Sequence, residues 1–434
     1  MCGAPRRNDF CSPAGNGLAL LARHIPRLLS LGINALYIGP LFESSSHGYD
    51  TVDYYHVDRR LGNNNDLKEL VRVLHENGIA VILDGVFNHT GRDFFAFKDI
   101  KEKREKSPYA NWYSNINFSQ NNECNDGFSY EGWAGHNSLA KLNLGCREVR
   151  DHLLGAVQYW IEEFSIDGLR LDAANVISVD FLRELSSFSK HLKNPFWLMG
   201  EIVAGDYRSL AHEGCLDSVT NYELYKSLWS SFHDQNIYEL SWTLKRECAG
   251  DGLYPDIALY NFADNQDVNR IASALNDQAH LFPLYGALFC APGIPSIYYG
   301  SEYGIYGKRG AYDDYELRLA WEDRWSESNL GKDLFNTICL FSKLRRESDA
   351  LKNGNYTELL VDYDQLFAFA RETDNETIAV VINASPEKKE CILKNGKIGN
   401  SQWIDLLSEE KFAAKNNTLK MEVYPSWLRI LKRS

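Results

Sequence analysis

The sequence of 434 residues lacks an excess of positive charge. It contains 59 Asp and Glu against 46 Lys and Arg, which gives a formal net charge of −13. Proteins that bind nucleic acid or an anionic membrane surface normally present a basic patch, so the composition disfavours both kinds of partner. No apolar run approaches the ~20 residues of a transmembrane helix. No apolar segment follows the basic residues near the N-terminus, so we do not expect a secretory signal.

The cysteines also lack the pattern of a disulfide framework. There are nine of them, an odd number, scattered and without a Cys-x-x-Cys pair. This favours the reduced thiols of a cytoplasmic protein. Internal repeats and low-complexity segments are absent as well. Aromatic residues are abundant, with 10 Trp, 24 Tyr and 21 Phe. They indicate either a large core or platforms on which sugar rings stack.

Short apolar runs alternate with helical patterns over most of the chain. A helix is predicted over residues 18–30, and apolar helical stripes fall at Leu67, Leu70, Val71 and Leu74 and again between Leu153 and Phe164. Strands are predicted at residues 33–38, 79–83, 167–172, 196–201, 216–220, 257–262 and 295–299. Such repetition predicts right-handed βαβ units and a parallel sheet. Seven strands in series favour a (β/α)8 TIM barrel over an open doubly wound sheet.

Only seven of the eight strands of that barrel are visible in the sequence. Residues 1–17 contain Gly, Pro, Asn and Ser but no strand-like run, so the first strand is either missing from this chain or supplied from an unexpected place. Two further stretches do not follow the strand–helix alternation of a barrel. Residues 88–146 are too long for an ordinary loop and predict an inserted subdomain B after strand three. Residues 350–434 alternate apolar and polar positions between turn signals, and a last strand is predicted over residues 423–431. This pattern predicts a C-terminal antiparallel β-sandwich. The barrel itself would comprise residues 1–87 and 147–349.

Polar side chains gather where the predicted strands end, which is the edge of a barrel that carries active sites. Asp84, Asp172, Glu201 and Asp267 each follow a different strand, and Arg170 lies two residues before Asp172. Burying like charges together is costly unless they perform a task or bind a metal. Any one of them alone would be a strand-end cap or an ion pair. Jointly they predict a functional site.

These strand ends resemble the signature regions of the α-amylase family, glycoside hydrolase family 13. The four regions, in order, are LDGVFNHT, GLRLDAANV, GEIV and NFADNQD, and HGYDTVDYY and GIPSIYYGSE also look like family stretches. The resemblance implies that Asp172 is the nucleophile and Glu201 the general acid/base. It implies that Asp267 grips sugar hydroxyls where the bond breaks. Tyr49 and His89 match positions that contact the same ring, and Asp84 matches a structural position.

Physical chemistry supports the same roles. Retaining glycosidases need two carboxyl groups ~5–5.5 Å apart. The ends of adjacent parallel strands, which lie ~4.8 Å apart, can supply that separation. Arg170 lies on the same side of its strand as Asp172, and we expect it to keep that carboxylate ionised.

The sequence departs from the family pattern in several places. The usual Asn-His-Asp of the fourth region is Asn265-Gln266-Asp267 here, so a neutral amide replaces an imidazole. Asn175-Val176 stands where many starch-degrading members have Lys-His. Asn88 matches a calcium-ligand position of some members, but the other ligands cannot be placed, so calcium is not supported and no metal or cofactor is predicted.

The run GFSYEGWAGHNSLAKLNL in the predicted subdomain places Trp133 between small residues. It would either stack on a sugar or form a small core. Similar runs ending in KLN occur in members that act on cyclodextrins and short maltooligosaccharides.

The function that these patterns favour is retaining hydrolysis of α-1,4-glucosidic bonds in oligosaccharides inside the cell. Two alternatives stay open. The same covalent intermediate could be intercepted by a sugar hydroxyl, which gives a transglycosylase. The altered fourth region and the missing strand also suit a non-catalytic family member. The bond type, endo or exo action and the oligomeric state cannot be read from the sequence.

Overall fold

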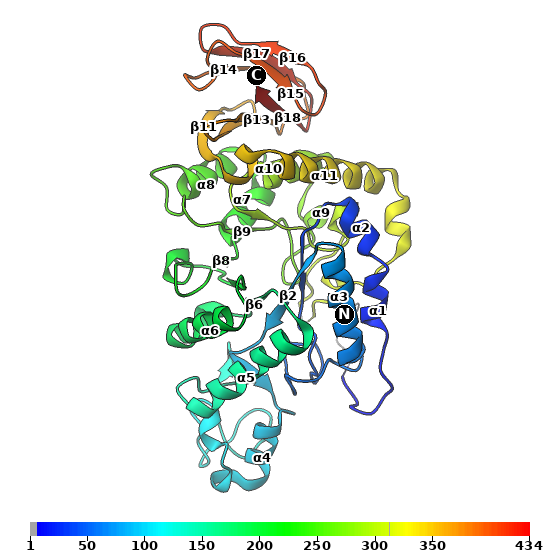
Figure 1. Ribbon diagram of the computed structural model, residues 1–434, viewed down its shortest axis with the longest axis vertical. Coiled ribbons are helices and arrows are strands. Elements are labelled where there is room, and N and C mark those ends of the chain that lie inside the picture. The colour runs from blue at the N-terminus through cyan, green and yellow to red at the C-terminus, as the bar shows by residue number, and fades with distance from the viewer. Residues whose placement is uncertain (1–6, 312) are drawn as a thin grey trace. The chain divides into compact units, whose positions relative to one another are not determined.

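The computed structural model describes residues 7–311 and 313–434, which form two compact units. The first unit ends at Val219 and the second begins at Thr220. Figure 1 shows the chain as a ribbon.

A five-stranded parallel sheet is the centre of the first unit. Its strands lie in the order β1-β2-β6-β7-β8. Their bounds are Ala35–Ile38 for β1, Ala80–Gly85 for β2, Gly168–Leu171 for β6, Trp197–Gly200 for β7 and Ser218–Val219 for β8. These are the first five strands that the sequence predicts. Because the order follows the chain, each new strand is added beside the previous one, as right-handed βαβ units require.

Helices connect most of these strands. They are α1 (Gly17–Ala22), α2 (Ile25–Ser30), α3 (Asn64–Glu76), α4 (Phe95–Lys103), α5 (Arg147–Phe164) and α6 (Val179–Leu192), with the 3-10 helices η1 (Arg104–Lys106), η2 (Ala110–Trp112), η3 (Ala174–Val176) and η4 (Tyr207–Ser209). Both predicted apolar stripes are buried, in α3 and in α5. Helix α3 begins at a capping box, in which Asn63 and Asp66 satisfy each other's backbone N–H groups.

The single helix predicted over residues 18–30 is wrong. The chain forms α1 and α2 instead, and they are separated at Arg23 and His24. Pro26 has no N–H to donate and is tolerated only in the first turn of a helix, so a new helix begins just before it.

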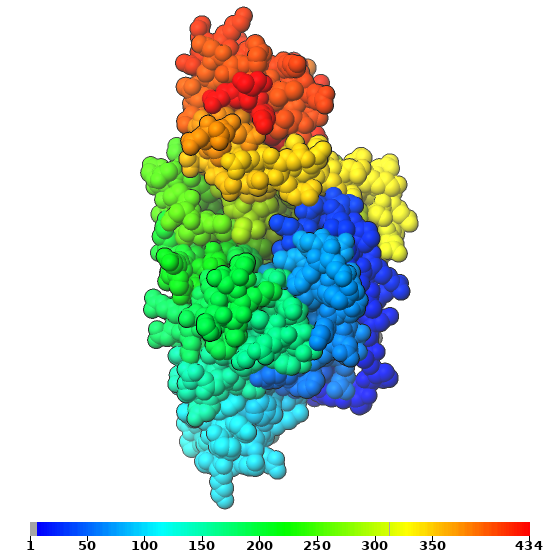
Figure 2. All heavy atoms as spheres, in the orientation of Figure 1, coloured from blue at the N-terminus to red at the C-terminus, as the bar shows by residue number. Residues whose placement is uncertain are grey.

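Residues 89–141 fold beside the parallel sheet around an antiparallel sheet of their own. Its strands are β3 (His89–Gly91), β5 (His136–Lys141) and β4 (Gly132–Trp133), in the order β3-β5-β4. Phe97, Phe128 and Tyr130 pack together beneath it with ring centroids 5.0–5.7 Å apart. In Figure 2 the cyan atoms of this segment gather at one end of the first unit.

The second unit contains the other two predicted strands as a short parallel pair, β9 (Tyr260–Asn261) and β10 (Ile294–Pro295). Strand β10 covers only the start of the predicted 295–299 run. The helices are α7 (Tyr222–His233), α8 (Tyr238–Cys248), α9 (Ile271–Ala274), α10 (Leu281–Cys290), α11 (Asn329–Glu347) and α12 (Asp349–Asn353), with η5 (Gln278–His280), η6 (Ser301–Tyr303), η7 (Tyr315–Leu317) and η8 (Asp323–Glu327).

Two antiparallel sheets end the second unit. One has the order β11-β12-β13-β18-β15-β16 and the other pairs β14 with β17. Their bounds are Asn355–Val361 for β11, Leu366–Glu372 for β12, Thr377–Asn383 for β13, Lys389–Lys394 for β14, Gln402–Asp405 for β15, Lys411–Ala413 for β16, Thr418–Val423 for β17 and Trp427–Arg433 for β18. Side chains of both sheets share one buried core, which includes Val381, Leu393 and Leu419. The orange and red atoms of these strands form one body in Figure 2.

The strand predicted over residues 423–431 is also wrong. Strand β17 ends at Val423 and β18 begins at Trp427. Pro425 lies between them and cannot donate a ladder hydrogen bond, so the chain turns there and joins the other sheet. Within residues 7–311 and 313–434, no helix is long and apolar enough to cross a membrane.

Candidate active site

The register of the parallel sheet brings the predicted catalytic side chains of the first unit together. Asp84 on β2 lies opposite Arg170 on β6, and Leu171 on β6 lies opposite Gly200 on β7. Asp172 and Glu201 therefore leave adjacent strands at the same level. The hydrogen bond from the Glu201 N–H to the Leu171 carbonyl (3.0 Å) continues the sheet to that point.

One buried guanidinium holds three carboxyl groups. Arg170 is only 2% exposed. Its Nη1 lies 3.0 Å from Asp84 Oδ1 and 2.8 Å from Asp172 Oδ1, and its Nη2 lies 2.8 Å from Glu201 Oε2. These charge-assisted bonds fix both candidate catalytic carboxyl groups to one rigid, planar group.

Two tyrosines complete the surroundings of Arg170. The Tyr37 hydroxyl, from β1, donates to Asp84 Oδ2 at 2.7 Å. The rings of Tyr37 and Tyr49 each have their centroid 6.0 Å from the guanidinium carbon. Sequence reasoning missed Tyr37. Its only signal is a polar-tipped aromatic near the end of an apolar strand.

Burial dominates the ionisation of this cluster. It raises the pKa of Asp172 to about 8, although Arg170 acts in the opposite direction, and it also raises the pKa of Asp84. The expectation that Arg170 alone would keep Asp172 ionised is therefore wrong, because desolvation of a nearly enclosed carboxylate outweighs one shared cation. Burial thus favours the protonated forms of Asp84 and Asp172, while Arg170 favours their ionised forms. Acid catalysis by a carboxyl group requires its protonated form.

The backbone beside Asp172 also orients Glu201. Ala173 has a φ of 48°, in the left-handed region that non-glycine residues rarely adopt. In this conformation its N–H points at Glu201 and donates to Oε2 at 3.1 Å. Strained backbone of this kind persists where the surrounding structure imposes it, and it clusters at functional sites.

His89 is held in one neutral form. Its Nε2 donates to the Tyr49 carbonyl (3.1 Å), and its Nδ1 accepts from the side chain of Asn88 (3.2 Å). Burial lowers the pKa of His89 to about 4, so the imidazole is uncharged at neutral pH. A sugar hydroxyl at this position would share or replace the bond to Tyr49.

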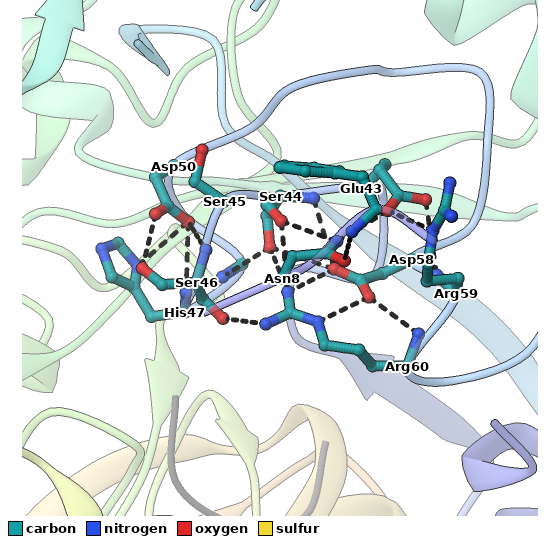
Figure 3. Close-up of polar contacts among 12 residues, drawn as sticks. Asn8, Glu43, Ser44, Ser45, Ser46, His47, Asp50, Asp58, Arg59 and Arg60 are labelled. Atoms are coloured by element: carbon teal, nitrogen blue, oxygen red, sulfur yellow. Dashed lines mark hydrogen bonds and ion pairs between the residues drawn. The ribbon is translucent and has the colours of Figure 1, made fainter. Parts of the chain in front are cut away.

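A polar network that includes Ser46, Asp50 and Arg60 lies in the loop after β1, as Figure 3 shows. Asp50 accepts hydrogen bonds from the N–H groups of Ser46 and His47, both at 3.1 Å. Arg60 binds Asp58 and donates to the Ser46 carbonyl. Because Asp50 and Asp58 are buried, these bonds leave the loop little freedom.

A cavity of ≈ 360 Å³ opens beside Glu201. Its lining includes Asn88, Glu131, Trp133, Lys141, Asn175, Val176, Glu201 and Val203. Trp133 lies on β4, half-buried, with its ring centroid 5.8 Å from that of His89. The segment around it has a separate aromatic core, so Trp133 is not needed as that core. This arrangement favours contact with a ligand.

Asp267 and Gln266 lie in the second unit, where an arginine that the sequence analysis did not identify organises them. Arg318 Nη2 lies 3.0 Å from Asp267 Oδ1, and its Nε donates to the Gln266 carbonyl at 3.3 Å. The Asp267 N–H donates to Asn265 Oδ1 at 2.8 Å. Asp264, which is buried, accepts from Ser301 instead, so it has a structural role. That Asp267 joins Asp172 and Glu201 stays a prediction.

No metal centre is evident in the part of the chain that the structure describes, since it contains no group of three or more His, Cys, Asp or Glu side chains placed to hold an ion. The Asn88 side chain, which matched a calcium-ligand position, is directed to His89.

The fold and the paired carboxyl groups define a class, and comparison with known proteins identifies it. Residues 17–350 match the family model described as alpha amylase, catalytic domain, and residues 356–426 match the maltogenic amylase C-terminal domain. The chain belongs to the α-amylase family and is a glycosidase of that family. The predicted TIM barrel followed by a C-terminal sheet domain is confirmed at this level.

Individual relatives are similar over most of this chain. A cyclomaltodextrinase of Bacillus sp is 34% identical over 376 residues, which cover 85% of this chain and 66% of the relative. Neopullulanase 2 of Thermoactinomyces vulgaris is 33% identical over 97% of this chain and 71% of its own length. A solved cyclomaltodextrinase structure superimposes with a TM-score of 0.88 at 30% identity and covers 100% of this chain and 73% of that one. This chain thus spans about two thirds of the length of these relatives.

Proposed function

We propose that this protein hydrolyses α-1,4-glucosidic bonds in maltooligosaccharides or related α-glucans with retention of configuration. The observation that carries the proposal is the binding of Asp172 and Glu201 to the same guanidinium, each at 2.8 Å, at the ends of neighbouring strands. A retaining mechanism needs two carboxyl groups held close together in different protonation states. Shared contact with Arg170 holds the two groups close together, and the guanidinium favours the ionised form of Asp172 against the effect of burial.

In the proposed reaction, the ionised Asp172 attacks the anomeric carbon while Glu201 gives its proton to the departing glycosidic oxygen. The bond from the anomeric carbon to that oxygen breaks as the ester to Asp172 forms. Glu201, now ionised, then takes a proton from water, whose oxygen displaces Asp172. Asp267 would hold hydroxyls of the sugar that reacts.

The substrate class follows from the residues around the two carboxyl groups. Tyr49 and His89 present an aromatic face and an imidazole beside Arg170, and Trp133 offers a further ring at the cavity. Aromatic faces suit the apolar faces of sugar rings. Relatives named cyclomaltodextrinase and neopullulanase support an α-glucan oligosaccharide as the substrate. We also propose a cytoplasmic location, which the scattered free cysteines support.

We propose the domain layout predicted above, with residues 88–146 as subdomain B and residues 350–434 as the C-terminal domain. The separate antiparallel sheet β3-β5-β4 supports the former. We further propose that residues 7–34 supply no barrel strand, because they hold only α1 and α2 among their regular elements. Residues 1–6 lie outside the described residues.

The test compares two substitutions on two substrates. Asp172→Asn should abolish turnover of both maltotriose and an activated aryl α-glycoside, because the amide cannot form the glycosyl ester. Glu201→Gln should lower kcat/KM on maltotriose by roughly 10²–10⁴-fold but much less on the aryl glycoside, whose leaving group needs little protonation. Equal losses of Glu201→Gln on both substrates would refute its role as the acid.

Product analysis separates the two alternative functions. A transglycosylase would convert maltotriose into longer oligosaccharides as well as shorter ones, because a sugar hydroxyl replaces water in the second step. A non-catalytic family member would convert neither maltotriose nor β-cyclodextrin at any enzyme concentration. The presence of both carboxyl groups, each bound to Arg170, favours a working enzyme.

A further inference from the structure

The cavity beside Glu201 has two chemically different walls. Trp133, Val176 and Val203 form an apolar part, and Val176 and Val203 are 45% and 56% exposed. Glu131 and Lys141 form a charged part, and they line the same cavity as the candidate acid. Since Glu201 would protonate the departing oxygen, the space next to it is the space into which the leaving group passes.

The antiparallel pairing of β3 with β5 aims Lys141 at this space. His89 on β3 lies directly opposite Lys141 on β5. Directly opposed residues of an antiparallel pair project from the same face of the sheet. His89 contacts the residues around Arg170, so Lys141 faces the same region, and it lines the cavity together with Glu201.

Glu131 holds the Lys141 ammonium in place. The two side chains form an ion pair with Nζ 2.5 Å from Oε1, and the other oxygen of Glu131 accepts from the Asn115 side chain at 3.0 Å. Glu131 thus occupies one of the three N–H donors of Lys141. The others remain available for hydroxyl oxygens within the cavity.

We propose that Lys141 is a specificity-determining residue that donates hydrogen bonds to hydroxyls of the leaving-group sugar. This inference rests on the proposed function. Trp133, Val176 and Val203 would contact the apolar face of that sugar. The site therefore selects a glucosyl or longer glucan leaving group, and it also receives the acceptor when the reaction runs backwards.

The experiment compares two glycosyl donors that differ only in the leaving group. Maltotriose and α-maltosyl fluoride both place a maltosyl unit on the donor side, but the first releases glucose and the second fluoride. Lys141→Met should lower kcat/KM on maltotriose by roughly 10- to 100-fold, the loss expected for charge-assisted hydrogen bonds. The loss on α-maltosyl fluoride should be at least about fivefold smaller, because fluoride makes no such bonds.

Further variants exclude a purely structural effect. Lys141→Gln, which keeps N–H donors, should recover part of the loss on maltotriose. Lys106→Met, an exposed lysine of η1, should match wild type on both donors. Melting temperatures of all variants are measured alongside. Equal losses of Lys141→Met on the two donors, or no loss on maltotriose, would overturn this inference while the wild-type activity stands. Failure of the proposed function itself would instead leave wild type inactive on both.

Discussion

At the scale of single residues, Arg170 holds the candidate catalytic carboxyl groups at the ends of the strands. It binds Asp84, Asp172 and Glu201 at once, and all three come from neighbouring strands. Such a cluster is costly to bury, since each carboxylate loses its hydration. The raised pKa of Asp172 expresses this cost. The proposed mechanism needs Asp172 to be ionised, so the site should reduce the stability of the fold.

This cost predicts a pH-dependent gain in stability for Asp172→Asn. Because the pKa of Asp172 in the folded protein, about 8, lies above the value of an exposed Asp near 4, the unfolded chain releases this proton more readily. The free energy of unfolding therefore falls as the pH rises from about 4 to about 8. A neutral amide at position 172 removes this dependence of the free energy of unfolding on pH. Asp172→Asn should raise the free energy of unfolding by an amount that grows to the order of a few kcal/mol at pH 8.

Chemical denaturation at pH 5 and pH 8 measures this difference. Asp217→Asn, a half-exposed carboxylate paired with Lys190, serves as the control and should show no such growth with pH. A constant difference between wild type and Asp172→Asn at the two pH values would show that Asp172 is ionised throughout the range.

At the scale of elements, β1 is the strand to test. Among the described residues it pairs only with β2, and its first residue, Ala35, is exposed. A strand edge with unpaired N–H and C=O groups is a template for association with another chain. A lysine at such an edge opposes association because its charge resists burial.

Ala35→Lys should therefore reduce concentration-dependent association of this chain. Its effect on the free energy of unfolding should stay within about 0.5 kcal/mol, since the position is exposed. Light scattering and sedimentation over a concentration series measure association. Asn77→Lys, which adds the same charge at the exposed end of α3, is the control. If both variants associate as wild type does, the β1 edge is not the site of association.

Elements with strong periodicity were predictable from the sequence. The stripe from Leu67 to Leu74 is buried in α3, and the predicted parallel strands of the first unit all form. The predicted bounds of helices and strands were wrong where a proline ended one element or began another. Pro26 starts a second helix, and Pro425 divides a predicted strand in two. Apolar periodicity continues across both positions, so a pattern of hydrophobic residues alone does not reveal them.

At the scale of the whole molecule, the family was predictable from the signature regions, but the contacts of the residues in them were not. Tyr37 binds Asp84 across 47 positions of sequence, and Arg318 binds Asp267 across 51. Such contacts depend on the register of strands and the path of loops, which no single-sequence spacing encodes. The same holds for the ionisation of Asp172, because burial is a property of the folded chain.

We infer that Asp172 becomes covalently attached to the sugar while Glu201 acts as acid and base. Mass spectrometry of Glu201→Gln mixed with α-maltosyl fluoride tests it most directly. Fluoride departs without an acid, but water attacks slowly without a base, so the maltosyl ester should accumulate. We expect an adduct of one maltosyl unit, located by peptide mapping on Asp172 and absent from the Asp172→Asn, Glu201→Gln double variant. An adduct on another residue, or turnover with an inverted anomer and no adduct, would contradict the account.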